Sequence, residues 1–170
     1  MRLTTAWKYG IVCVATIAGA CRQESAVSQD PDAGARQSVF VPTEDVTLAR
    51  SLYSGIDTRE RLIIQSAAEW SSVWERIHGR QSPTPPIAQL DFNTEVGFVA
   101  TMGEKPSGGY TITIDSVTRH ERGSIVYVTE KSPSDTCFTP AVLTQAVHAI
   151  RAPKTDGSIW WRERATVENC

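Results

Sequence analysis

Alternation of apolar and polar residues is the main pattern of this chain from about residue 46 onward. Residues 95–102 place Val96, Phe98, Ala100 and Met102 on one face and Val99 on the other, as a central strand of a sheet does. Tyr110, Ile112 and Ile114 alternate with Thr111, Thr113 and Asp115, which predicts a half-buried strand. Further strands are expected at residues 62–64, 124–129, 146–151 and 159–167. In the last of these, Glu163 interrupts an apolar face.

One segment has the period of a helix instead. Trp70, Val73, Trp74 and Ile77 form a single apolar stripe at helical spacing. Ser66 and Glu69 have the spacing of a capping box, in which each side chain caps a backbone N–H at the start of the helix. Gly79 stands where a helix commonly ends on a residue in the left-handed region. We therefore expect a helix over about residues 67–78, with both tryptophans in the core.

Short strands separated by turns favour an antiparallel sheet or a sandwich. With one main helix, the predicted fold class is α+β with β predominating, built from about six to eight strands. Residues 46–170 are long enough for a single globular domain.

The first residues have the organisation of an export signal. Arg2 and Lys8 precede an apolar run from Tyr9 to Ala20, which is 12 residues long and ends in small residues. A run of this length is too short to span a bilayer, and the pattern is typical of a secretory signal peptide over residues 1–20. The same cleavage point is similar to a bacterial lipobox, in which Cys21 would carry the lipid. It departs from that pattern at Ala18, where Leu is usual.

The cysteine count agrees with a lipid anchor. After loss of Cys13 with the signal peptide, Cys21, Cys137 and Cys170 remain. In an exported chain a Cys137–Cys170 disulfide is expected, which leaves one cysteine over. Lipidation of Cys21 accounts for it; the alternatives are a free thiol after ordinary cleavage, or an intermolecular disulfide. The predicted location is the bacterial cell envelope, facing either the periplasm or the surface.

Residues 22 to about 45 are rich in Ser, Gln, Asp and Pro without apolar periodicity, so we expect a disordered tether between the lipid and the domain. Without Arg2 and Lys8, the chain has 15 basic and 19 acidic residues, a net charge of −4. The charges are mixed and form no basic patch, which argues against a nucleic-acid ligand.

The most distinctive loop joins two predicted strands. It comprises Glu104, Lys105, Pro106, Ser107, Gly108, Gly109 and Tyr110, preceded by Gly103. Proline and two glycines favour a tight turn, so one interpretation is a simple hairpin. The other is a recognition loop with exposed backbone groups, held by a rigid sheet, that contacts a protein partner. Its glycine spacing differs from that of nucleotide-binding loops.

These loop residues, followed by alternating isoleucines, resemble the PrcB-like C-terminal domain of protease-complex accessory lipoproteins. The flanking residues 53–56 and 61–64, the two helix tryptophans, Ser132-Pro133 before Cys137, and residues 147–153 extend the resemblance over about residues 50–170. It implies a non-catalytic protein that binds and stabilises an exported protease, and it brings no catalytic residues. A weaker similarity links residues 105–110 to the binding loop of chagasin-like cysteine-protease inhibitors, whose Asn and two Thr are absent here.

Catalytic and metal-binding signatures are weak. His78, His120 and His148 have no second histidine or carboxylate at metal-ligand spacing, so we expect no metal and no cofactor. The Gly-x-Ser-x-Gly motif of hydrolases is absent. Cys137 and His148 are conceivable as a thiol nucleophile and its base, and scattered Ser, His and Asp residues leave an unrecognised hydrolase open. The sequence therefore predicts a protein that is not an enzyme.

Overall fold

The computed structural model describes residues 38–40, 42 and 44–170. The predicted signal peptide, Cys21 and most of the predicted tether lie outside these residues. Within the described part, no helix is long and apolar enough to cross a membrane.

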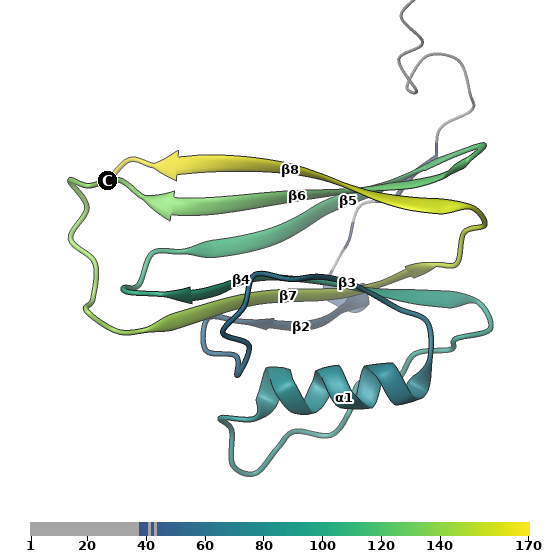
Figure 1. The fold of residues 1–170 in the computed structure, drawn as a ribbon, viewed down its shortest axis with the longest axis horizontal. Coiled ribbons are helices and arrows are strands. Elements are labelled where there is room, and N and C mark those ends of the chain that lie inside the picture. The colour runs from purple at the N-terminus through teal and green to yellow at the C-terminus, as the bar shows by residue number, and fades with distance from the viewer. Residues whose placement is uncertain (1–37, 41, 43) are drawn as a thin grey trace, which may run out of the picture. The chain divides into compact units, whose positions relative to one another are not determined.

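Within the described residues, eight strands form two sheets that pack face to face (Figure 1). Sheet A has the order β1-β5-β6-β8, and sheet B has the order β2-β7-β4-β3. Sheet A contains β1 (Ser38–Phe40), β5 (Thr111–His120), β6 (Gly123–Pro133) and β8 (Ser158–Glu168). Sheet B contains β2 (Thr47–Ser51), β3 (Arg61–Ile64), β4 (Glu95–Lys105) and β7 (Thr144–Pro153). A short 3-10 turn, η1 (Glu44–Val46), precedes β2. The β-predominant α+β sandwich expected from the sequence is confirmed.

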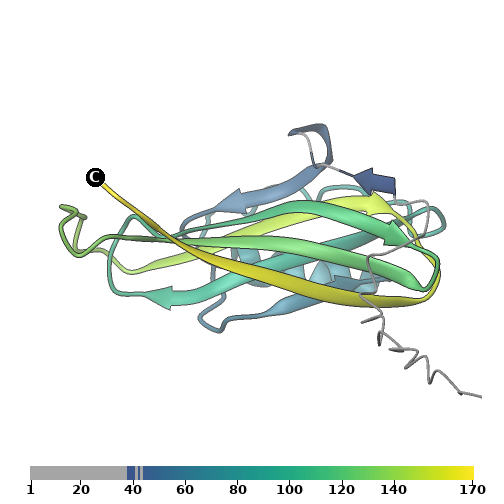
Figure 2. The same ribbon diagram turned by 90° about the horizontal axis from the view of Figure 1, so that it is seen from above.

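Three differences concern the strands. The expected strands within β4, β5, β6 and β7 are longer in the structure, because mostly polar residues at their ends, such as Glu104 and Lys105 in β4, continue the ladder without an apolar signal. β8 pairs with β6 in parallel, from Gly123↔Ser158 to Pro133↔Glu168, whereas the sequence favoured antiparallel pairing. β1 lies in the segment predicted as a tether, so the folded part begins before Val46. Figure 2 shows β1 beside β5 at the edge of sheet A.

The helix α1 (Ala67–His78) covers the outer face of sheet B (Figure 1). Its capping box is present: Glu69 N–H donates to Ser66 Oγ at 3.3 Å, and the Glu69 carboxylate accepts from Ser66 N–H at 3.1 Å. Gly79 is not left-handed, contrary to the prediction; its φ is −60°. The chain continues in a right-handed turn, in which Gln81 N–H donates to the His78 carbonyl at 2.8 Å.

Two apolar layers result from the alternation along β4. Phe98 and Ala100 face sheet A and join the core between the sheets, while Val99 faces α1 and joins the core beneath the helix. Trp70 and Trp74 are buried in that second core, where their ring centroids lie 5.3 Å apart edge to face. The predicted assignment of the tryptophans to the core is confirmed. With both faces of β4 buried, sheet B forms a rigid middle layer between the helix and sheet A.

Candidate functional site

The predicted recognition loop is not a hairpin. β4 belongs to sheet B and β5 to sheet A, so the residues between them cross from one sheet to the other. Glu104 and Lys105 still belong to β4, and Pro106–Tyr110 make the crossing. Alternation along each strand cannot reveal this, because a hairpin and a crossing between sheets leave the same local pattern.

Hydrogen bonds hold this loop against its neighbours. Gly108 N–H donates to the Pro140 carbonyl at 2.9 Å, and Thr144 Oγ1 donates to the Ser107 carbonyl at 2.8 Å. The Glu104 carboxylate accepts from Gln145 Nε2 at 3.0 Å. The loop is thereby fixed to the segment that leads into β7.

The predicted loop residues differ in exposure. Glu104, Pro106 and Gly109 are exposed, Lys105, Ser107 and Tyr110 are half-buried, and Gly108 is buried. Gly109 has φ +89° and lies against Pro133 and Thr139, so a glycine is needed there for both conformation and space. Tyr110 packs on the core between the sheets, as its alternation with Ile112 predicted.

Several exposed apolar side chains lie at the same end of the sandwich as this loop. Phe138 is 100 % exposed and Leu143 51 % exposed, both in the segment that Gly108 and Thr144 hold. Gln145 N–H donates to the Leu52 carbonyl at 2.8 Å, which brings Leu52 and Tyr53 to the same end of the sandwich. We call this surface the loop end; its apolar members are Leu52, Tyr53, Phe138, Val142 and Leu143.

Sequence reasoning missed the loop end. Five of the nine large hydrophobic side chains exposed in the described part of the chain gather there. They come from two segments far apart in the sequence, so no local pattern joins them. An available signal was Phe138, an isolated aromatic residue in a run otherwise rich in Ser, Thr and Pro.

A disulfide anchors the loop end. Cys137 and Cys170 are bonded, with 5.4 Å between their Cα atoms, as the cysteine count predicted. Ser134 N–H also donates to the Glu168 carbonyl at 3.0 Å. The segment that carries Phe138 is therefore tied to the end of β8. The pairing also removes Cys137 as a thiol nucleophile, and His148 instead accepts a hydrogen bond from Ile114 N–H at 2.8 Å.

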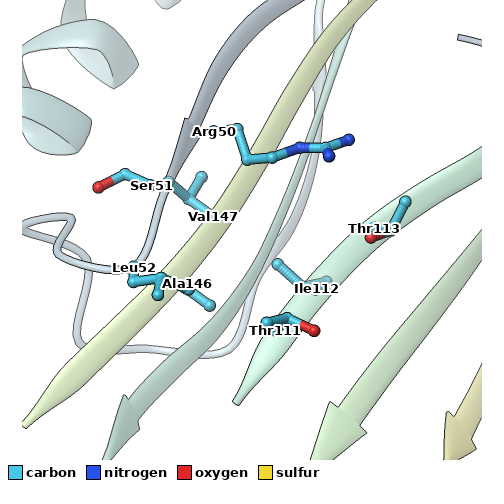
Figure 3. Close-up of a pocket in the computed structure, with 8 residues that line it drawn as sticks. All are labelled: Arg50, Ser51, Leu52, Thr111, Ile112, Thr113, Ala146 and Val147. Atoms are coloured by element: carbon cyan, nitrogen blue, oxygen red, sulfur yellow. The ribbon is translucent and has the colours of Figure 1, made fainter. Parts of the chain in front are cut away.

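A cleft of about 330 Å³ opens beside the loop end, between β2 and β5 (Figure 3). Leu52 lines the cleft and is also a member of the loop end. Arg50 extends from β2 across the opening toward β5. Within the described residues, no group of three His, Cys, Asp or Glu side chains is placed to hold a metal ion.

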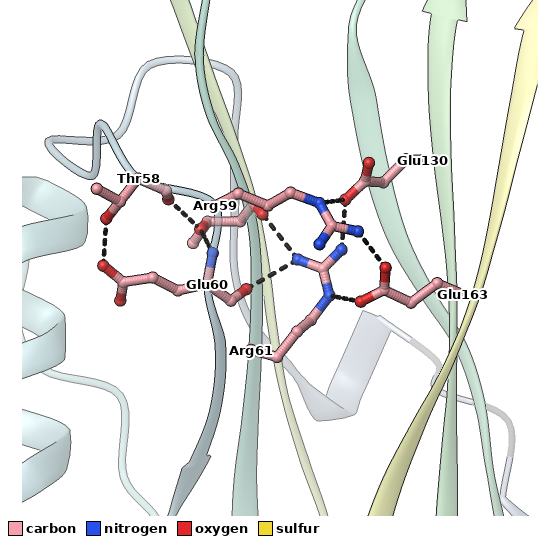
Figure 4. A network of polar contacts seen from close by, with 7 residues as sticks. Thr58, Arg59, Glu60, Arg61, Glu130 and Glu163 are labelled. Atoms are coloured by element: carbon pink, nitrogen blue, oxygen red, sulfur yellow. Dashed lines mark hydrogen bonds and ion pairs between the residues drawn. The ribbon is translucent and has the colours of Figure 1, made fainter.

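An ion-pair network joins the two sheets at the opposite edge, where β3 faces β8 (Figure 4). Arg61 pairs with Glu163 at 2.8 Å and with Glu130, and it also donates to the carbonyls of Glu60 and Thr101 at 2.8 and 2.7 Å. Arg59 pairs with the same two carboxylates. Burial acts to raise the pKa of Glu163, but Arg59 and Arg61 outweigh it and hold that pKa below its ordinary value. Glu163, which interrupts the apolar face of β8, is thus the anchor of this network.

Replacing Arg61 with methionine is expected to lower the free energy of unfolding by about 2–3 kcal/mol, because two carbonyls and two carboxylates lose a donor. The Arg61 side chain is only 10 % exposed, whereas that of Arg59 is 49 % exposed. Arg59→Met is the matched control and should cost less than about 1 kcal/mol. Urea unfolding of both variants measures the difference, and equal losses would contradict this account of the network.

Residues 98–153 match the family model described as PrcB C-terminal. The match confirms the resemblance found in the sequence, over a shorter stretch than the expected residues 50–170. It runs from within β4 to the end of β7 and so includes the predicted loop and most of the loop end. No curated protein and no solved structure matches the chain significantly.

Proposed function

We propose, from the premise that residues 98–153 belong to the PrcB C-terminal family, that this chain is a non-catalytic accessory protein. Its loop end binds an exported protease and stabilises it. The family is one of accessory domains without catalytic residues, which supports the absence of enzymatic activity. In this proposal the solvent-accessible residues of Glu104–Tyr110 and the exposed apolar residues of the loop end form one contact surface.

The observation that carries the proposal is the exposure of the loop end. An apolar patch on a rigid, disulfide-anchored support costs free energy in water unless a partner covers it. Exposed aromatic residues often supply most of the binding energy of an interface. Phe138, with its side chain fully exposed, is the expected anchor.

Phe138→Ser is expected to weaken partner binding at least about tenfold, because interface anchors typically contribute more than 1 kcal/mol. The free energy of unfolding should change by no more than about 0.5 kcal/mol, since the side chain makes no buried contact. Full-length protein is used to purify its partner from cell envelopes, and affinities are then measured by surface plasmon resonance.

Val39→Ser is the matched control, because Val39 is 59 % exposed and lies on β1, away from the loop end. It should bind like the unchanged protein. The half-life and activity of the purified protease are measured with and without the chain. A longer half-life supports stabilisation, while loss of activity on binding would make the protein an inhibitor. If Phe138→Ser and Val39→Ser bound the partner equally well, the loop end would not be part of the interface.

Anchorage is a separate part of the proposal. Cys21 carries a lipid that holds the protein on the bacterial cell envelope, with residues 22–37 as spacer. Intact-mass analysis of membrane-extracted protein should show a diacyl or triacyl addition to residues 21–170, and Cys21→Ser should move the protein to the soluble fraction. A membrane-extracted mass equal to the bare residues would contradict lipidation.

A further inference from the structure

The cleft between β2 and β5 exposes a free sheet edge. β1 pairs with β5 only from Val117 to Arg119, because the chain then passes to sheet B. Among the described residues, the first half of β5 has no strand neighbour on that side. Thr111 and Ile112, at the start of β5, line the cleft.

Some backbone groups of β5 face away from β6, toward the side of the sheet on which the cleft lies. Ile114 N–H donates to His148 Nδ1 at 2.8 Å, so it faces away from β6. Successive residues of a strand direct their N–H and C=O groups to alternate sides, which makes Ile112 face the same way as Ile114. Ile112 therefore offers a donor and an acceptor to a strand placed in the cleft.

Arg50 lines the cleft, and its guanidinium lies against the ring of His148, which does not itself line the cleft. His148 is fully buried, and burial together with Arg50 lowers its pKa to about 4, so the ring is neutral at pH 7. Its Nδ1 accepts from a backbone N–H, which leaves the proton on Nε2. That Nε2–H lies 3.0 Å from Nη2 of Arg50, which can only donate. Within the described residues, no carboxylate pairs with Arg50.

We propose that the cleft binds an extended segment of a partner protein. The segment adds a short strand to the free edge of β5 and places a carboxylate against the guanidinium of Arg50. Strand addition supplies backbone hydrogen bonds at Ile112. The carboxylate gives the guanidinium of Arg50 an acceptor, which Arg50 can bind through two of its N–H groups. The partner segment is therefore acidic at one position, by an Asp or Glu side chain or a chain terminus.

This inference extends the proposed function, since Leu52 joins the cleft to the loop end, but it does not require contact at Phe138. The probe is a displayed library of random peptides selected on the full-length protein. Affinities of the enriched peptides are measured by fluorescence anisotropy. We expect these peptides to carry an acidic residue, and Arg50→Gln to weaken their binding at least about tenfold. Hydrogen exchange of the Ile112 amide should slow on binding.

Arg122→Gln is the matched control, because Arg122 is an exposed arginine in the turn between β5 and β6. It should leave peptide affinity unchanged, and so should Phe138→Ser, which separates this cleft from the loop end. Replacing the acidic residue of the peptide by its amide should weaken binding as much as Arg50→Gln does. Combining the two changes should weaken binding no further. Failure to enrich acidic peptides, or equal binding by Arg50→Gln, would overturn the proposal. The proposal would also be overturned if the chain formed a dimer that Arg50→Gln dissociates, because the cleft would then be occupied by a second copy of the chain.

Discussion

Replacing Cys137 and Cys170 together with serine is expected to lower the free energy of unfolding by about 3–4 kcal/mol. The disulfide spans 33 residues, and closing a loop of that length restricts the unfolded chain by roughly this amount. Denaturant unfolding of the double variant and of the reduced, unchanged protein measures the effect.

The same substitution tests what the disulfide does for the loop end. Without it, the segment around Phe138 keeps its hydrogen bonds through Ser134 and Pro140 but loses its covalent tie to β8. We expect hydrogen exchange to quicken in residues 134–143 more than in β4, which is buried on both faces. A loss below about 1 kcal/mol, or uniform quickening across the domain, would contradict the assigned role.

Acidification from pH 7 to 4 is expected to cost about 3 kcal/mol of stability through His148 alone. Burial, with a smaller contribution from Arg50, lowers the pKa of His148 from 6.5 to about 4 in the folded protein. Between these values the unfolded chain binds a proton at this position and the folded chain does not, so the free energy of unfolding falls as pH falls. Each pH unit in that interval is worth about 1.4 kcal/mol.

His148→Gln removes this titration and should flatten the dependence of stability on pH between 6.5 and 5. Below about pH 4.5 the carboxylates held at low pKa, such as Glu163, add a further loss as they become protonated. His78→Gln serves as the control and should retain the acid sensitivity, because His148 is still present. An unchanged slope in His148→Gln would mean that the imidazole is not held neutral by the fold.

Local chemistry explains which elements could be predicted from the sequence. Ser66 and Glu69 cap the helix at its start. Trp70 and Trp74 belong to an apolar stripe at helical spacing, which can be recognised from the sequence of this segment alone. The placement of Phe98 and Val99 on opposite faces of β4 likewise follows from the alternation of apolar residues alone. Gly79 was misassigned because a glycine permits a left-handed ending without requiring one.

Long-range pairing explains what could not be predicted. The parallel pairing of β6 with β8 joins strands with no turn between them, so no local signal marks it. Glu163 appeared as an interruption of an apolar face, and only its contacts with Arg59 and Arg61 give the reason. The loop end depends on Leu52 meeting Gln145, and the cleft depends on β1 ending before it covers β5.

Photo-crosslinking from position 138 tests the central claim most directly. A photoreactive phenylalanine analogue replaces Phe138 in the full-length protein on the cell envelope, and a second variant carries it at Val39. The account predicts a crosslink to an exported protease from position 138 and none from position 39. Equal crosslinking from both positions, or crosslinking from position 39 alone, would contradict binding through the loop end.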